Sequence, residues 1–417
     1  MYKRFAPIVA ACFSLLGCGA GKATDAHPIQ QQDPPALDSV NHIVFMMQEN
    51  EVFDHYFGQL NNYRQSLGLS PDADVTPQNA TQLAYDHSVS FTPFHMVSMC
   101  TEDLSSFWNE SHNDWNHASP TSGVSLMDGF ANSAGNNSRH SPTGFDIDGK
   151  RVMGYYDETD LPYYYFMATQ FAISDRWFSA VMSNTPSNRM YAVAATSHGV
   201  INKPLVQANV ATIFDELDSA GITWKNYVQD YPKGSSLRPF PVYAKSVGTK
   251  IAPMADYFTD LANGTLPQVA FIERDAREGL DEHPGAGNSV QKGAAYVATI
   301  INALMTSGAW KDSIFFLIYD EGRVLRPRFP GANGFTRRNS PNLGPQRYLR
   351  REGRSDLRFR LYRLSHPQSR GLTLRKAALR RSHTHRQHGN SSIYRTTLRT
   401  ALPHKTRCRP AGHQLFL

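Results

Sequence analysis

Two continuous apolar runs of strand length stand out along the chain. One runs from His42 to Met47 and stops at the polar residues 48–50, and the other runs from Ser313 to Tyr319 and stops at residues 320–322. A run that is apolar at every position, rather than at alternate positions, is typical of a strand buried on both faces of a parallel sheet. We therefore predict two such strands, each followed directly by polar residues.

A helical pattern precedes the second of these strands. Apolar residues recur with a spacing of three and four from Val290 to Leu304, and the dipeptide at 307–308, Ser-Gly, is a stop signal. A helix followed by a buried strand is half of a parallel crossover unit. A short helix over Ile213–Leu217 and a strand over Gln268–Ile272 repeat the alternation. The pattern predicts an α/β domain with a mainly parallel sheet flanked by helices.

The N-terminus follows a different pattern. Residues 1–18 begin with Lys3 and Arg4, continue with an apolar run too short to span a bilayer, and end in Leu-Leu-Gly followed by Cys18. This segment resembles a bacterial lipoprotein signal, in which the cysteine is lipidated and becomes the new N-terminus; a plain secretory signal is the alternative. Residues 19–38 show no apolar period and are predicted to be a linker. We expect a protein of the bacterial cell envelope, anchored through Cys18 or released into the periplasm.

Composition excludes the disordered, collagen-like and coiled-coil classes, because 41% of the residues are hydrophobic and 19% are charged. The net charge of +6 is unevenly distributed. Residues 1–322 carry 19 Lys and Arg against 34 Asp and Glu, a net charge of −15, whereas residues 323–417 carry 23 against 2, a net charge of +21. Val324 and Ile393 are the only β-branched aliphatic residues of this second part.

Such an abrupt change in composition is typical of a shifted reading frame. We interpret residues 323–417 as an Arg-rich, disordered tail of this origin, which leaves the fold of residues 39–322 incomplete at its C-terminal side. The alternative is a basic arm that binds nucleic acid or anionic lipid. The lack of interleaved aromatic residues and the envelope signal argue against a nucleic-acid partner.

Oxygen ligands follow both of the predicted strands. Glu49 and Asn50 come after the first strand, and Asp320 and Glu321 come after the second. In open α/β sheets, ligands bind beyond the carboxyl ends of the strands, so these four side chains can meet there. Carboxylate and amide oxygens suit a hard divalent cation. Taken singly, each pair is also compatible with an ordinary polar turn at a strand end.

Four segments, in order, resemble a known family. They are His42–Gly58 (HIVFMMQENEVFDHYFG), Thr185–Tyr191 (TPSNRMY), Asp281–Pro284 (DEHP) and Trp310–Gly322, which ends in Tyr-Asp-Glu-Gly. Together they resemble the bacterial phosphoesterase family that contains non-haemolytic phospholipases C and metal-dependent acid phosphatases, a branch of the alkaline phosphatase superfamily. The resemblance implies an alkaline-phosphatase-like sheet and hydrolysis of phosphate esters.

The resemblance also implies roles for single residues. Asn50, Asp320 and Glu321 are the implied ligands of one divalent metal ion, with Glu49 beside them, and Thr185 is the implied nucleophile. The chemistry agrees, because a divalent ion favours the alkoxide of a threonine and neutralises charge on a phosphoryl oxygen. A phosphothreonine would form and then be hydrolysed. Without the surrounding segments, Thr185 would be interpreted as part of an ordinary turn before a proline.

Two histidines complete the implied site. His283 lies in the DEHP segment, and His112 lies between the first signature and the nucleophile. In the family such imidazoles contact phosphoryl oxygens and protonate the leaving group, which suits a side chain whose pKa is near neutrality. The chain departs from the family pattern at Glu51 and Val52, where Arg-Ser is usual, and at Ser187, where proline is usual.

The predicted function is therefore a phosphoesterase of the cell envelope that acts on phosphomonoesters or on the headgroup phosphodiester of phospholipids. Two other classes remain open at this stage. One is a catalytically inactive envelope binding protein of the same fold, and the other is a basic binder of nucleic acid or anionic lipid.

Overall fold

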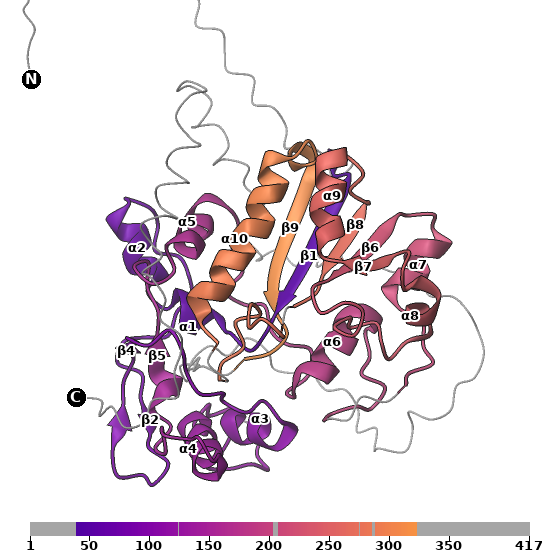
Figure 1. Cartoon of the computed structure of the whole chain (residues 1–417). Helices are drawn as coiled ribbons and strands as arrows, with labels where there is room; N and C mark the ends of the chain where they lie inside the picture. Colours follow the sequence, from indigo (N-terminus) through magenta and orange to yellow (C-terminus); the bar gives the residue numbers. More distant parts are fainter. Residues whose placement is uncertain (1–38, 124, 203–206, 275, 286–287, 323–417) are drawn as a thin grey trace, which may run out of the picture. The chain divides into compact units, whose positions relative to one another are not determined.

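The computed structural model describes residues 39–322 except for residues 124, 203–206, 275 and 286–287 (Figure 1). The predicted signal (1–18), linker (19–38) and Arg-rich tail (323–417) lie outside the described residues. None of the described helices is both long and apolar enough to cross a membrane.

A five-stranded parallel sheet forms the centre of the domain, with the order β7-β6-β8-β1-β9. The register places Phe45 of β1 between Phe271 of β8 and Phe316 of β9. The two strands predicted from continuous apolar runs are thus direct neighbours, although residues 49–312 separate them in the sequence. The strands are β1 (His42–Gln48), β6 (Trp224–Val228), β7 (Ile251–Pro253), β8 (Val269–Ile272) and β9 (Ser313–Tyr319).

Helices cover the two faces of the sheet, as burial on both faces requires. On one face, alternate residues of β1 such as Val44 and Met46 pack in a core with helices α1, α5, α9 and α10. On the other face, Met47 joins a second core with residues of α6, α7 and α8. These helices are α1 (Phe53–Phe57), α5 (Pro162–Gln170), α6 (Thr185–Ala194), α7 (Ile213–Ser219), α8 (Pro241–Ser246), α9 (Ala255–Asn263) and α10 (Val290–Thr306).

Most residues between α2 (Leu60–Ser66) and α5 form a smaller lobe near the carboxyl ends of β1 and β9 (Figure 1). Its own small core contains Phe130 and Ala134 of α4 and Val152 of a short 3-10 helix. The remaining elements are α2 (Leu60–Ser66), α3 (Trp108–Trp115), α4 (Phe130–His140), the 3-10 helices Lys150–Met153 and Trp310–Asp312, and the two-residue strands β2 (Gln82–Leu83), β3 (Ser90–Phe91), β4 (Phe94–His95) and β5 (Gly154–Tyr155).

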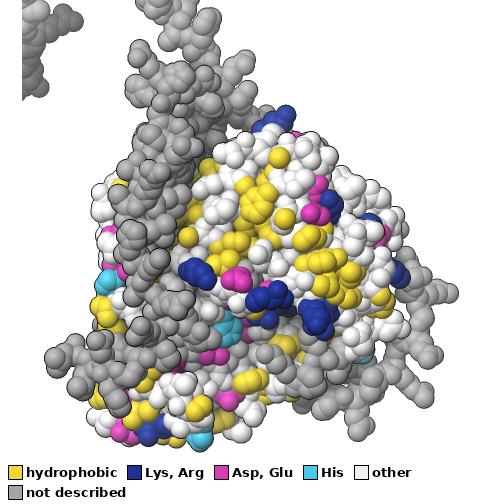
Figure 2. Space-filling model, in the orientation of Figure 1, with side chains coloured by type: hydrophobic (Ala, Val, Ile, Leu, Met, Phe, Trp, Pro, Cys, Tyr) yellow, Lys and Arg dark blue, Asp and Glu magenta, His cyan; other side chains and the backbone are white. Residues whose placement is uncertain are grey.

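The predicted fold class is confirmed, and all strand pairs of the main sheet are parallel. In the described part of the chain β9 is an edge strand, and Phe316 on it is 39% exposed. Figure 2 shows apolar side chains around α9 and α10, and charged side chains of both signs below these helices, where the strands end.

Candidate active site

Three buried carboxylates meet at the carboxyl ends of β1 and β9. Glu49 follows β1, and Asp320 and Glu321 follow β9. Because Gln48 pairs with Tyr319 in the sheet register, the residues that follow them emerge side by side. One oxygen from each of the three carboxylates lies within 4.8 Å of the other two. Neighbouring strands thus bring together groups that are far apart in sequence.

Thr185 is the first residue of α6, and its hydroxyl points at these carboxylates. Its Oγ1 donates a hydrogen bond to Glu321 Oε1 at 2.8 Å and lies 3.2 Å from Glu49 Oε2. Asn184, in an extended conformation, is the N-cap residue but makes no side-chain capping hydrogen bond, and Pro186 occupies the first turn, where proline is favoured. The helix start therefore fixes the direction of the Thr185 hydroxyl.

Asn50 joins the cluster through a strained backbone. Its φ of 56° is in the left-handed region, which non-glycine residues rarely adopt. This conformation lets its amide N–H donate to Asp320 Oδ1 at 3.3 Å. Asn50 Oδ1 and Glu321 Oε2 are both buried, and neither has a hydrogen-bond partner in the part of the chain that the structure describes.

These two oxygens without partners bear on the metal predicted from the sequence. A buried oxygen that accepts no hydrogen bond carries a desolvation penalty, which coordination of a cation removes. The nearby donor set consists only of carboxylate, amide and hydroxyl oxygens, which suit a hard cation such as Mg²⁺, Mn²⁺ or Ca²⁺. The residues present therefore fit a divalent metal ion.

Arg189 is a site residue that the sequence analysis missed. It is buried one helical turn after Thr185, and its Nε donates to Glu49 Oε1 at 3.0 Å and to Asp320 Oδ2 at 2.9 Å. Its Nη1 also pairs with the buried Glu273 at 3.2 Å. The spacing of four residues from Thr185 on a helix, which puts both side chains on one face, was the signal that could have identified it.

The site holds three buried carboxyl groups against the guanidinium groups of Arg189 and Arg274, and Arg274 Nη1 lies 2.9 Å from Glu49 Oε1. Burial and the charge of Asp320 raise the pKa of Glu49, and burial followed by the charges of Asp320 and Glu49 raises the pKa of Glu321 well above its usual range. Burial acts to raise the pKa of Asp320, but the charges of Arg189 and Arg274 and the hydrogen bonds with Glu49 and Glu321 together outweigh it, so the pKa is lowered. Such unbalanced charge is what a bound cation relieves.

His283 lies next to Asn50. Its Nδ1 donates to the Pro284 carbonyl at 2.6 Å, because a carbonyl can only accept, so Nε2 is left to accept from Asn50 Nδ2 at 3.1 Å. Burial acts to lower the pKa of His283, but the charges of Asp103, Glu49 and Asp281 and the hydrogen bond to the Pro284 carbonyl together hold the pKa above its usual value. With Nε2 as an acceptor the imidazole is neutral here, and its raised pKa favours the protonated form in which Nε2 can meet an anionic group.

His112 is not brought into this cluster. It lies on α3, where its Nδ1 donates to the Trp108 carbonyl at 2.7 Å and its ring packs on that indole with centroids 4.0 Å apart. Within the described residues, no hydrogen bond or ion pair joins it to Thr185 or to the carboxylates. The loop before α3 does reach the site, because Ser106 Oγ donates to Glu321 Oε1 at 3.0 Å.

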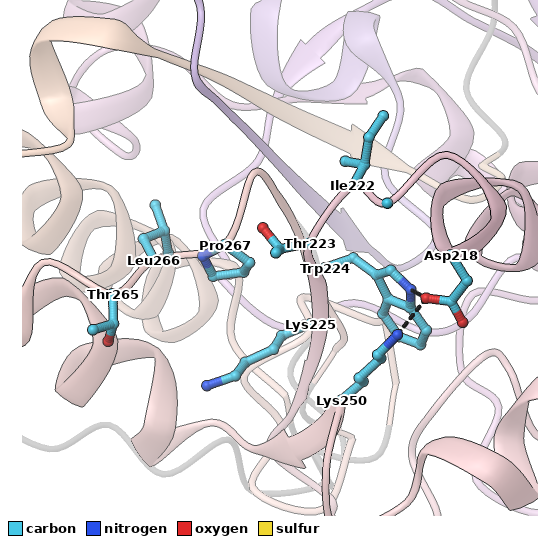
Figure 3. Close-up of a pocket in the computed structure, with 10 residues that line it drawn as sticks. Asp218, Ile222, Thr223, Trp224, Lys225, Lys250, Thr265, Leu266 and Pro267 are labelled. Carbon is cyan, nitrogen blue, oxygen red and sulfur yellow. Dashed lines mark hydrogen bonds and ion pairs between the residues drawn. The ribbon is translucent and has the colours of Figure 1, made fainter.

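A separate pocket of about 480 Å³ lies at the other end of the sheet (Figure 3). It is lined by Thr223 and Trp224, where β6 begins, and by Pro267 ahead of β8. Its charged groups satisfy one another: Asp218 accepts from Trp224 Nε1 at 2.7 Å and pairs with Lys250. This pocket is therefore remote from the carboxylates, which lie at the carboxyl ends.

Residues 40–324 match the model of the phosphoesterase family. Among curated proteins, the chain is 28% identical to non-specific phospholipase C5 of Arabidopsis thaliana, over 67% of this chain and 54% of that protein. It is 26% identical to phospholipase C B of Mycobacterium tuberculosis, over 75% and 63%, and 27% identical to a non-hemolytic phospholipase C of Burkholderia pseudomallei, over 74% and 46%. The chain thus spans about half to three fifths of the length of these relatives.

Proposed function

Because the chain belongs to the phosphoesterase family, we propose that it hydrolyses phosphate esters with Thr185 as the nucleophile. The observation that carries this proposal is the position of the Thr185 hydroxyl, which is within hydrogen-bond distance of Glu321 and Glu49 at the carboxyl ends of two parallel strands. A hydroxyl next to carboxylates has a proton acceptor within hydrogen-bond reach, which nucleophilic catalysis requires.

Glu49, Asn50, Asp320 and Glu321 would hold one divalent metal ion in this proposal. Two observations support it: the oxygens of Asn50 and Glu321 without partners, and the surplus of negative charge. When bound, such an ion favours the ionised form of the nucleophile and neutralises phosphoryl oxygens.

The positions of the side chains support the following sequence of steps. Thr185 Oγ1 attacks phosphorus while its proton passes to Glu321 Oε1, the ester P–O bond breaks, and the leaving oxygen takes a proton from Nε2 of His283 in its protonated form. The phosphoryl group is then carried by Thr185. Water attacks the phosphorus and gives a proton to His283, while the Thr185 oxygen leaves and regains its proton from Glu321. A phosphomonoester releases phosphate, and a phosphodiester releases the phosphorylated headgroup. The leaving-group role predicted for His112 stays a prediction.

The substrate is either a phosphomonoester or the headgroup phosphodiester of a phospholipid. The names of the relatives, which are phospholipases C, favour the phosphodiester. The residues after Cys18 would tether the enzyme at the envelope, where phospholipids are within reach. Labelling with palmitate that disappears in Cys18→Ser would support lipid anchoring, and labelling that survives would exclude it.

The function is tested by assaying the full chain with Mn²⁺ on p-nitrophenyl phosphate and on p-nitrophenyl phosphorylcholine. We expect Thr185→Ala to lower kcat at least ~10³-fold, as loss of a nucleophile does. Thr299→Ala, which removes an exposed hydroxyl bonded to the Ala295 carbonyl of α10, is the matched control and should keep wild-type turnover. Full activity in Thr185→Ala would refute the assignment, and no turnover by the wild-type chain would favour an inactive binding protein.

A further inference from the structure

A buried carboxyl group lies behind the proposed active site and collects three tyrosine hydroxyls. Glu282 Oε2 accepts from Tyr56 at 2.9 Å and from Tyr319 at 2.7 Å, and Glu282 Oε1 accepts from Tyr164. The three tyrosines come from α1, the end of β9 and α5. One side chain therefore ties its own loop to three separate elements.

The backbone of this loop is held in an unusual conformation. Glu282 has a φ of 67°, in the left-handed region, and is 1% exposed. Gly293 of α10 provides the space for it, because a Cβ at that position would lie 2.1 Å from Glu282 Cγ. A non-glycine residue at positive φ persists only where its surroundings hold it, and here the three hydroxyls do so.

The residues on either side of Glu282 both touch the site. The Asp281 carbonyl accepts from the Glu49 amide at 3.0 Å, and His283 Nε2 lies 3.1 Å from Asn50 Nδ2. At the other end of the network, Tyr319 directly precedes Asp320. If the Glu282 side chain rotated out of its three hydrogen bonds, it would therefore disturb both the contacts to the residues after β1 and the end of β9, where the carboxylates lie.

Packing alone does not call for a carboxyl group at this position. Burial raises the pKa of Glu282 to about 7, so its ionised form is disfavoured there. A buried polar network of this kind adds little net stability, but when fully satisfied it specifies one arrangement of the elements it joins.

We propose that Glu282 is a positioning residue that, through Tyr56, Tyr164 and Tyr319, holds His283 and the Asp281 carbonyl against the carboxylate cluster. It does not touch the reacting atoms. An effect of Glu282 on kcat rests on the proposed function (the catalytic consequence). Its effect on the positions of His283 and the Asp281 carbonyl (the positional consequence) does not.

Three variants of the full chain separate these consequences. Glu282→Ala removes both acceptor oxygens, and Glu282→Gln keeps an acceptor of the same shape. Tyr165→Phe is the matched control, because it removes a buried hydroxyl of α5 that bonds to the Tyr156 carbonyl at 3.1 Å rather than to Glu282. Should Glu282→Ala fail to fold, Tyr56→Phe removes the single hydrogen bond from the Tyr56 hydroxyl to Glu282 Oε2.

Hydrogen exchange gives a readout that needs no activity. We expect the Glu49 amide, which bonds to the Asp281 carbonyl, to exchange faster in Glu282→Ala than in Tyr165→Phe at equal global stability. In p-nitrophenyl phosphate hydrolysis, kcat should fall about 10–100-fold in Glu282→Ala, with a smaller change in KM, and Glu282→Gln should restore most of it.

The outcomes are distinguishable. Equal exchange of the Glu49 amide in Glu282→Ala and Tyr165→Phe would overturn the positioning role, whatever the activity. If wild-type protein hydrolyses no phosphate ester but the exchange differs as expected, the proposed function fails and the positioning role stands. If the wild type is active and kcat is unchanged in Glu282→Ala, the catalytic consequence is wrong.

Discussion

Arg189 provides most of the buried positive charge beside the carboxylates of the site, and the less buried Arg274 also pairs with Glu49 at 2.9 Å. Arg189 pairs with Glu49, Asp320 and Glu273, whose side chains are themselves fully buried. Removing one partner of a buried charge network leaves unpaired charges in a medium of low dielectric. We expect Arg189→Met to lower the free energy of unfolding by about 3–5 kcal/mol, measured by urea denaturation without added metal.

The matched control is Arg176→Met. Arg176 pairs with Asp74 at 2.8 Å, but 71% of its side chain is exposed. An exposed pair contributes about 0–1 kcal/mol, so this variant should unfold close to wild type. Equal stability of the two variants would show that Arg189 does not compensate the site charges.

Glu282 makes stability depend on pH near neutrality. Its pKa is raised from 4.5 to about 7 by burial, so the folded state binds the proton more tightly than the unfolded state. The stabilisation is fully present below about pH 4.5 and is lost as the pH rises through about 7. At ~1.4 kcal/mol per pKa unit, the loss amounts to about 3 kcal/mol.

Glu282→Gln removes this titration and leaves the other groups in place. The difference in unfolding free energy between wild type and variant should therefore change by about 3 kcal/mol between pH 4.5 and 8, in the direction that favours the variant at high pH. A difference that stays constant with pH would show that Glu282 titrates normally.

At the scale of elements, the hydrophobic pattern predicted the strands that carry the site. β9 has the predicted bounds, and β1 is one residue longer than the predicted run. The bounds could be predicted because few conformations bury a continuous apolar run of this length. The adjacency of these two strands explains why Glu49 and Asp320 could be placed together from sequence.

Other parts of the site did not follow from the apolar pattern of the sequence. Arg189 and Glu282 are charged residues whose burial depends on partners from distant elements, and periodicity carries no information about such partners. His112 forms a local bond to Trp108 within its own helix, and its distance from Thr185 is set by how the smaller lobe packs. Motif resemblance placed the Thr185 segment but did not predict that a helix begins at that residue.

The docking of α10 onto the DEHP segment depends on Gly293. Alanine is favoured over glycine in a helix by up to about 1 kcal/mol, but its Cβ would lie 2.1 Å from Glu282 Cγ. We expect Gly293→Ala to destabilise the protein by about 1–3 kcal/mol through overpacking, measured by thermal unfolding. Gly308→Ala, whose Cβ meets no atom within 4 Å, is the control. A Gly293→Ala protein more stable than wild type would contradict this packing.

At the scale of the whole molecule, the chain divides at Gly322. The match to the family ends at residue 324, and the net charge changes from −15 for residues 1–322 to +21 for the remainder. We expect another forward reading frame of the coding DNA after codon 322 to encode a polypeptide rich in Val and Ile. If neither other frame does so, residues 323–417 must be regarded as a native basic segment.

The central claim, that Thr185 attacks phosphorus, is tested most directly by trapping the covalent intermediate. Wild-type chain is mixed with p-nitrophenyl phosphate and Mn²⁺, quenched in acid within the first turnover, and digested for mass spectrometry. We predict one added phosphoryl group on the peptide that contains Thr185, and none in Thr185→Ala. Turnover by the wild type with phosphate on another residue, or with no covalent phosphate at any quench time, would contradict the account.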